Sequence, residues 1–228
     1  MEIFGLEKVS FVDYENQICA TVFTGGCNFL CPFCHNSGLV KKDFQKYEVE
    51  EVLSYLSSRK SLLDAVTISG GEPTLQKDLP DFISKVKSLG YKIKLDTNGT
   101  NPEMLSLLIK KNLIDYVAMD IKSNFDDYSS ITGVPSPNVE RIKKSLSVLK
   151  NSGIAYELRT TLVKEFHSQK NIEKMVDELG GHKTLYLQKF VDSGSCMKAN
   201  LNDIPKSEAE KFKQILEQKV ENVMLRGY

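Results

Sequence analysis

Three cysteines, Cys27, Cys31 and Cys34, lie within eight residues of one another in the spacing C-x3-C-x2-C. Thiolates are soft ligands that suit zinc and iron–sulfur clusters. A 4Fe–4S cluster usually has four cysteine ligands. Three cysteines at this spacing would hold three irons and leave one iron open. The motif therefore predicts a cluster that binds a further molecule.

Other ligand sets are weaker. Cys19 lies in an apolar run typical of a buried strand, where free cysteine packs as a small hydrophobe, and the role of Cys196 in its Gly/Ser segment stays undecided. A structural zinc site usually needs a second ligand pair downstream. His35 adjoins the motif, but His167 and His182 each stand alone. A disulfide framework is not expected, because an odd cluster of cysteines in a chain without a secretory signal fits a reducing compartment.

The cysteine motif, with the aromatic Phe33 before its last cysteine, resembles that of the radical S-adenosylmethionine (SAM) superfamily. The resemblance implies that Cys27, Cys31 and Cys34 hold a 4Fe–4S cluster whose open iron binds the amino and carboxylate groups of SAM. It also implies that an electron from the reduced cluster cleaves SAM, which releases a 5′-deoxyadenosyl radical that abstracts hydrogen. Phe33 would pack against adenine or shield the cluster, although plain packing is the alternative.

Composition indicates an ordinary globular chain rather than a nucleic-acid or membrane protein. Lys+Arg and Asp+Glu both number 30 among 228 residues, so no overall basic field would hold nucleic acid. The N-terminus has acids where a secretory signal needs a basic start, and no apolar run approaches the ~20 residues of a membrane span. We expect a cytoplasmic protein with a single domain over residues 1–228. Its core would cover about residues 15–190, followed by a C-terminal helix and extended tail over 200–228.

Strand-like and helix-like stretches alternate about six times, with connections short enough for right-handed βαβ units. Extended segments are expected at residues 3–13, 17–23, 65–68, 91–95, 116–119, 156–163, 184–191 and 220–225. Helices are expected at residues 47–57, 79–89, 102–111, 139–151, 171–179 and 205–218, and residues 123–137 are expected to be a loop. Periodicity leaves a doubly wound sheet and an open barrel as alternatives. The resemblance implies a partial (β/α)6 TIM-like barrel of parallel strands, with the cluster loop after the first core strand.

Polar or glycine-bearing motifs follow the core strands, where α/β folds place their chemistry. The first, Gly70-Gly71-Glu72-Pro73, lets backbone approach a ligand and offers a carboxylate to an ammonium group. A plain turn explains these residues as well. The motif also resembles the superfamily's GGEP motif, which implies that Gly70, Gly71 and Glu72 engage the amino group of SAM through the backbone.

Two further strand-end motifs are Asp96-Thr97-Asn98-Gly99 and Asp120-Ile121-Lys122. Helix capping explains the first, and a solvated lysine explains the second. They also resemble the DTNG and D-x-K motifs of glycyl-radical-enzyme activases. The resemblance implies that Lys122 meets the carboxylate or ribose of SAM and counts Asn98 among the cofactor contacts. Asp96 and Asp120 would bracket the sulfonium end, directly or through a bound monovalent cation.

Arg159 and the residues after the cysteine motif carry weaker signals. Arg159 lies inside an expected strand, where a functional inward side chain and a solvated outward one are equally open. His35 and Asn36 match the Cys-His-Asn of activases, and we expect them to make hydrogen bonds around the cluster loop rather than to bind iron.

The N-terminal 40 residues show a narrower likeness, carried by residues 11–14, 20–28 and 34–36, to activating proteins of anaerobic ribonucleoside-triphosphate reductase. It implies an activase that takes hydrogen from a glycine of that glycyl-radical enzyme, with a reductant such as flavodoxin or ferredoxin. Glu15-Asn16 replaces the family's frequent Pro-Gly, and no late histidine occurs within residues 187–191.

Two alternatives stay open. A small-molecule radical enzyme resembling 7-carboxy-7-deazaguanine synthase would usually have Gln-Gly-Glu-Gly before its cysteines, where this chain has Tyr14-Glu15-Asn16-Gln17. A non-catalytic iron–sulfur electron-transfer module would have no use for the strand-end motifs.

Overall fold

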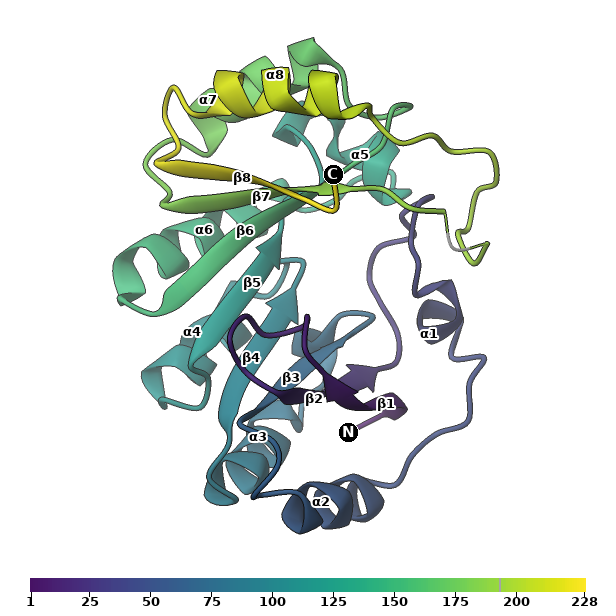
Figure 1. Cartoon of the computed structure of the whole chain (residues 1–228), viewed down its shortest axis with the longest axis vertical. Helices are drawn as coiled ribbons and strands as arrows, with labels where there is room; N and C mark the ends of the chain where they lie inside the picture. The colour runs from purple at the N-terminus through teal and green to yellow at the C-terminus, as the bar shows by residue number, and fades with distance from the viewer. Residues whose placement is uncertain (193) are drawn as a thin grey trace. The chain divides into compact units, whose positions relative to one another are not determined.

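The computed structural model describes residues 1–192 and 194–228, and within them eight strands form a sheet whose strand order follows the sequence. The strands are β1 (Ile3–Ser10), β2 (Cys19–Thr24), β3 (Ala65–Gly70), β4 (Lys92–Thr97), β5 (Tyr116–Asp120), β6 (Ala155–Leu162), β7 (Thr184–Lys189) and β8 (Asn222–Arg226) (Figure 1). Each expected extended segment is present. A doubly wound sheet reverses its strand order at a switch point, and this order shows no reversal. The α/β class with a partial-barrel order is therefore confirmed.

The helices also follow the expected pattern, with two differences. They are α1 (Ser37–Lys41), α2 (Val49–Ser58), α3 (Leu79–Ser88), α4 (Pro102–Lys110), α5 (Tyr128–Thr132), α6 (Val139–Ser152), α7 (Gln169–Glu178) and α8 (Lys206–Leu216), with 3-10 turns at Pro73–Leu75 and Phe125–Asp127. The short α1 was not predicted. The loop prediction for residues 123–137 is wrong where α5 forms, because α5 buries Tyr128, Ile131 and Thr132 and ends at Gly133 with φ 68°. None of the described helices is long and apolar enough to cross a membrane.

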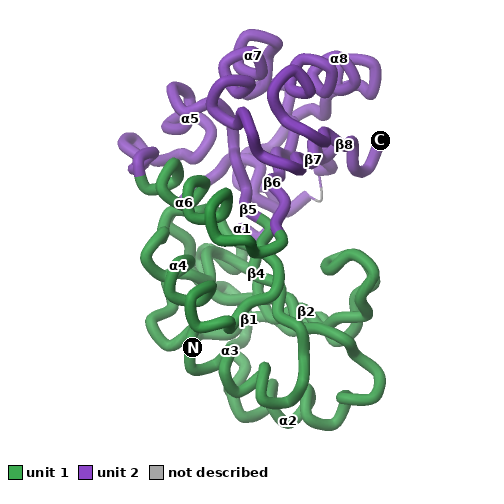
Figure 2. The backbone as a smooth tube through the Cα atoms, turned by 90° about the vertical axis from the view of Figure 1, so that its left-hand side faces the viewer, with its two compact units in different colours: residues 1–28, 38–118, 141–155 green, residues 29–37, 119–140, 156–228 purple. Residues whose placement is uncertain are grey.

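The chain divides into two compact units (Figure 2). Unit 1 comprises Met1–Asn28, Gly38–Ala118 and Arg141–Ala155, and unit 2 comprises Phe29–Ser37, Met119–Glu140 and Tyr156–Tyr228. The expectation of a single domain over residues 1–228 stays a prediction.

In unit 1, β1 runs antiparallel to β2, and β2, β3 and β4 run parallel. The residues of β2 and β3 are buried on both faces, as is usual for parallel strands covered by helices. Helices α2 and α3 contact each other and bury their apolar stripes. In this register Thr24 pairs with Gly70, and Ile68 pairs with Leu95. The carboxyl ends of the three strands therefore lie at one edge, where their loops begin.

In unit 2, the parallel strands β6, β7 and β8 have one apolar face and one polar face. Helices α7 and α8 pack side by side over β7 and β8 (Figure 1). Leu158 and Leu185 are register partners and fully buried. Arg159 and its partner Tyr186 lie on the opposite face, because successive side chains alternate along a strand. Arg159, whose orientation the sequence left open, therefore lies on the polar face of β6.

Candidate active site

The Gly-Gly turn after β3 holds the backbone that leads into the cysteine motif. The N–H of Gly71 donates to the carbonyl of Thr24 at 2.9 Å, and the N–H of Glu72 donates to the carbonyl of Gly26 at 2.9 Å. A Cβ atom at Gly71 would lie 1.9 Å from the oxygen of Gly26. Glycine is therefore required at position 71 for close backbone approach, and the turn fixes the chain immediately before Cys27.

Gly71→Ala is expected to lower the free energy of unfolding by at least about 2 kcal/mol, because the added carbon overlaps backbone that has no free rotamer. It should also lower the iron bound per chain after reconstitution. Urea denaturation and iron analysis measure both effects. Gly180→Ala is the matched control, since its Cβ would meet its nearest neighbour at 3.4 Å, an ordinary contact. Equal stabilities for the two variants would contradict this account of the turn.

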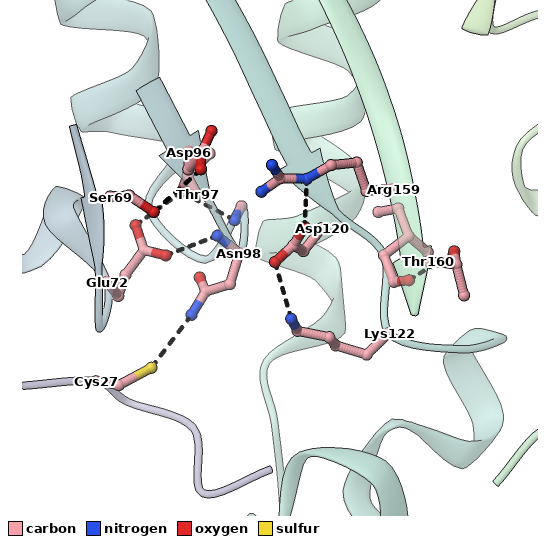
Figure 3. A network of polar contacts seen from close by, with 12 residues as sticks. Cys27, Ser69, Glu72, Asp96, Thr97, Asn98, Asp120, Lys122, Arg159 and Thr160 are labelled. Carbon is pink, nitrogen blue, oxygen red and sulfur yellow. Dashed lines mark hydrogen bonds and ion pairs between the residues drawn. The ribbon is translucent and has the colours of Figure 1, made fainter. Parts of the chain in front are cut away.

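The Glu72 side chain is 0% exposed and joins the β3 turn to the end of β4. One carboxylate oxygen accepts from the Thr74 N–H at 3.1 Å and from the Thr74 hydroxyl at 2.5 Å. The same oxygen accepts from the Thr97 hydroxyl at 2.7 Å (Figure 3). The other accepts from the Asn98 N–H at 2.6 Å. Burial raises the pKa of Glu72, and these hydrogen bonds oppose the rise. The side chain is thus occupied by protein donors, and a contact between the Glu72 backbone and SAM stays a prediction.

Asn98, expected among the cofactor contacts, lies beside the first cysteine of the motif. Its amide nitrogen is 2.9 Å from Oδ1 of Asn28 and 3.9 Å from Sγ of Cys27. Asn28 in turn donates to the hydroxyl of Thr100 at 2.9 Å. Sequence reasoning gave no role to Asn28 or Thr100, although Asn28 directly follows Cys27.

Asp96 has a cation from its own strand beside it. The ammonium of Lys94, which is 5% exposed, lies 3.5 Å from Oδ1 of Asp96, and the Ser69 hydroxyl donates to Oδ2 at 3.0 Å. Lys94 also donates to the carbonyl of Asp13. Sequence reasoning missed Lys94, yet its position two residues before Asp96 puts both on one face of β4. The role of Asp96 toward the sulfonium or a cation stays a prediction.

In unit 2, Asp120 lies between two cations. Lys122 Nζ is 2.9 Å from Oδ2 of Asp120, and Arg159 Nε is 2.9 Å from Oδ1 (Figure 3). Burial opposes the charge on Asp120, but Arg159 and Lys122 together hold its pKa at about 2. The side chains of Arg159 and Lys122 are only 14% and 17% exposed. The structure therefore decides against the solvated alternatives for both residues.

The backbone of Lys122 is held by residues that sequence reasoning missed. Its N–H donates to the hydroxyl of Tyr128 at 3.0 Å, and its carbonyl lies 2.8 Å from Nε2 of His167. Tyr128 is fully buried in α5, and burial raises its pKa. The ring of Phe33 lies 5.9 Å from Lys122 Nζ. Lys122 is thus positioned along both its main chain and its side chain.

His167 is expected to make stability depend on pH. Nδ1 accepts from the Val163 N–H at 3.0 Å, so the hydrogen bond to Lys122 assigns the proton to Nε2. Burial lowers the pKa of His167 below 6.5. A second proton, on Nδ1, therefore binds to the unfolded chain at a higher pH than to the folded chain. The stabilisation by neutral His167 is complete above pH 6.5 and is lost as pH falls through the folded pKa.

The free energy of unfolding of the cluster-free protein should therefore fall as pH is lowered from about 7 to about 5. His167→Gln should cost about 1 kcal/mol at neutral pH and vary less over the same interval. Urea denaturation at each pH gives the two slopes. A variant with the wild-type slope would show that His167 does not carry the effect.

The second and third cysteines of the motif lie in unit 2. Cys31 is buried and its carbonyl accepts from the Cys34 N–H at 3.0 Å. Burial raises the pKa of the Cys31 thiol to about 11 and also raises that of Cys34, while Lys122 acts in the opposite direction. Phe33 is buried and its ring centroid lies 6.0 Å from that of Phe166. Packing by Phe33 is therefore present, and its contact with adenine stays a prediction.

The remaining His and Cys residues behave largely as expected. Nε2 of His35 lies 2.5 Å from the carbonyl of Val191, and its ring stacks on Phe190 with 5.5 Å between centroids. The expected hydrogen bonding of His35 is confirmed. Cys19 is fully buried in β2, as its apolar run predicts, and Cys196 keeps no assigned role.

The donor set of the motif fits a 4Fe–4S cluster, because it offers three soft thiols from one short loop. Thiols must lose their protons to bind metal, and burial favours the protonated form of Cys31 and Cys34. Within residues 1–192 and 194–228, no three His, Cys, Asp or Glu side chains are already gathered as metal ligands. The assignment of Cys27, Cys31 and Cys34 as ligands rests on the motif and stays a prediction.

Comparisons with known proteins define the class. The family model "Radical SAM superfamily" matches residues 21–179, and the chain belongs to this superfamily. Radical SAM proteins use a 4Fe–4S cluster and SAM, so these two predicted cofactors and the prediction of an enzyme are confirmed. The fold is shared with a radical SAM methyltransferase from Sphaerobacter thermophilus, at 17% identity and a TM-score of 0.74 over 96% of this chain and 68% of that one.

Two curated relatives extend the comparison. A Methanocaldococcus jannaschii protein, provisionally named a glycyl-radical enzyme activating enzyme, is 32% identical over 98% of this chain and 95% of its own length. A Saccharolobus solfataricus protein, provisionally named a GTP 3′,8-cyclase, is 31% identical over 55% of this chain and 42% of its own length. The match therefore covers nearly all of this chain and of the first relative, and less than half of the second relative's length.

Proposed function

We propose that the chain is a radical SAM activase that forms a glycyl radical on a partner enzyme. The observation that carries this proposal is the likeness to the M. jannaschii relative over nearly the whole of both chains. The cyclase relative has more than half of its length outside the match. The likeness of residues 11–14, 20–28 and 34–36 supports anaerobic ribonucleoside-triphosphate reductase as the partner.

The proposed site uses the chain's own residues for binding and orientation. Cys27, Cys31 and Cys34 hold the cluster, which when bound supplies the electron that cleaves SAM and so starts hydrogen abstraction. The Gly-Gly turn is assigned to the amino group of SAM through its backbone, as its likeness to the superfamily's GGEP motif implies. Lys122, fixed by Asp120 and Arg159 in unit 2, is assigned to the carboxylate or ribose of SAM.

The finer assignments follow from the same proposal. A flavodoxin or ferredoxin supplies the electron, a monovalent cation is the proposed companion of the strand-end carboxylates, and the cytoplasm is the proposed location. The balance of 30 basic and 30 acidic residues supports a partner other than nucleic acid.

Electron paramagnetic resonance tests the proposal directly. The anaerobically reconstituted and reduced protein is mixed with SAM and the large subunit of anaerobic ribonucleotide reductase, and 5′-deoxyadenosine is assayed in parallel. A glycyl-radical doublet is expected, together with 5′-deoxyadenosine. Deoxyadenosine without the doublet would overturn the partner and favour a small-molecule substrate, as the name of the cyclase relative suggests. If cluster-loaded protein gives neither the doublet nor 5′-deoxyadenosine, that result would overturn the radical chemistry itself.

A further inference from the structure

We propose that Asn98 is a positioning residue whose side-chain amide donates a hydrogen bond to the sulfur of Cys27 and makes the cluster easier to reduce. The inference rests on the proposed function, because it takes Cys27 as a cluster ligand. It gives Asn98 a role toward the cluster in place of the expected contact with SAM. The observation behind it is the approach of Nδ2 of Asn98 to Sγ of Cys27, at 3.9 Å (Figure 3).

The surrounding hydrogen bonds fix which end of the Asn98 amide faces the sulfur. Oδ1 of Asn98 lies 3.0 Å from the N–H of Thr100 and 2.6 Å from its hydroxyl. Because a backbone N–H can only donate, the atom facing it must be the acceptor end of the amide. The amino end therefore points the other way, toward Asn28 and Cys27.

The three side chains close a ring of hydrogen bonds in which each donates to the next. Asn28 donates to the Thr100 hydroxyl at 2.9 Å, Thr100 donates to Oδ1 of Asn98, and Asn98 donates to Oδ1 of Asn28 at 2.9 Å. An amide nitrogen carries two N–H bonds. The Asn28 contact uses one of them, and the Cys27 sulfur lies near the same nitrogen to accept the other.

The main chain of Asn98 is held as firmly as its side chain. Its N–H donates to the buried Glu72 carboxylate at 2.6 Å, and the next carbonyl, that of Gly99, accepts from the Ser145 hydroxyl at 2.7 Å. Asn98 is 6% exposed. A donor held this way before the cofactor binds needs little reorganisation when the sulfur becomes a ligand.

A donor at a ligand sulfur favours the more negative form of the cluster. Reduction adds one electron, and much of the added charge is felt at the thiolate sulfurs. A nearby N–H dipole stabilises that charge, and more strongly where water is excluded. Hydrogen bonds to the sulfurs are among the factors that set cluster potentials. The Asn98 amide should therefore raise the midpoint potential and ease electron transfer to the cluster.

The test is a redox titration of the reconstituted protein followed by electron paramagnetic resonance. Asn98→Leu removes the donor with little change in volume, and Asn98→Asp replaces it with a carboxylate. We expect the midpoint potential to be most positive for the wild type, more negative for Asn98→Leu and most negative for Asn98→Asp. The matched control is Asn101→Leu, which removes contacts to Thr74 and Met104 at the same edge without touching the sulfur. Its potential should equal that of the wild type.

A second measurement covers the case in which the Asn98 variants lose their cluster. The wild-type protein is prepared with asparagine labelled with 15N in the side chain, and the reduced cluster is examined for hyperfine coupling to that nitrogen. Coupling that is lost in Asn28→Leu alone would assign it to Asn28 and overturn the proposal. Unchanged potentials in both Asn98 variants, or no 15N coupling in the wild type, would also overturn it. These outcomes leave SAM cleavage and the glycyl-radical doublet intact, whereas failure of the proposed function appears as a missing doublet in the wild-type protein.

Discussion

Replacing Cys27, Cys31 or Cys34 with alanine is expected to abolish SAM cleavage. Each substitution removes one of the three thiols that the proposed cluster needs. Loss of groups that merely support metal ligands typically costs 10–100-fold, so loss of a ligand should cost more than about 100-fold. Iron and sulfide content, together with 5′-deoxyadenosine formed after reduction, measure the effect.

Cys19→Ala is the matched control for these variants. Cys19 is fully buried in β2 and its sulfur accepts a hydrogen bond from Thr67 at 3.7 Å. Its replacement should leave a small cavity and a modest loss of stability, about 1 kcal/mol, with full iron content and cleavage. Wild-type cleavage by any one of the three motif variants would contradict the ligand assignment.

Replacing Glu72 with alanine is expected to give the largest loss of stability at the site. The change leaves the donors of Thr74, Thr97 and Asn98 facing a buried cavity. An unsatisfied buried donor costs about 1–3 kcal/mol, so we expect a loss of about 3 kcal/mol or more in the free energy of unfolding. SAM binding should weaken as well, because the strand-end loops lose their common anchor. Urea denaturation and equilibrium binding of SAM measure the two effects.

Two further variants sharpen this prediction. Glu72→Gln keeps the shape but turns one acceptor into a donor, so its loss should lie between those of the wild type and Glu72→Ala. Glu173→Ala removes a carboxylate on an exposed face of α7 that accepts from Gln169, and it should change stability by less than about 0.5 kcal/mol. A Glu72→Ala protein as stable as Glu173→Ala would refute the anchoring role.

Sequence periodicity predicted the order of strands and helices because burial repeats locally in each element. It missed α5 because residues 123–137 contain many turn-forming residues, and the burial of Tyr128 that stabilises the helix depends on distant chain. The strand-end motifs placed Asp120 and Lys122 correctly at a strand end, where the structure pairs them.

The partners of the motif residues were harder to predict. Lys94 lies in the expected strand over residues 91–95 with no motif around it, and only the fold shows it beside the carbonyl of Asp13 and the carboxylate of Asp96. Thr100 and His167 carry no local signal, because each contacts a residue that is far away along the chain. Thr100 accepts a hydrogen bond from Asn28, and His167 contacts the carbonyl of Lys122. Motifs therefore predicted which residues meet the cofactors, while the side chains that orient those residues became visible only in the fold.

The hydrogen bonds around Asn98 join residues that are far apart in the sequence. Glu72 and Asn98 are separated by 26 positions, Gly99 and Ser145 by 46, and Asn28 and Thr100 by 72. Closing such long loops costs entropy before any contact repays it, and non-local contacts form slowly. This edge of unit 1 should consequently assemble late, once its parallel strands are paired. Newly made chains would therefore hold Cys27 in its final surroundings only after folding, which delays cofactor loading until the sheet is complete.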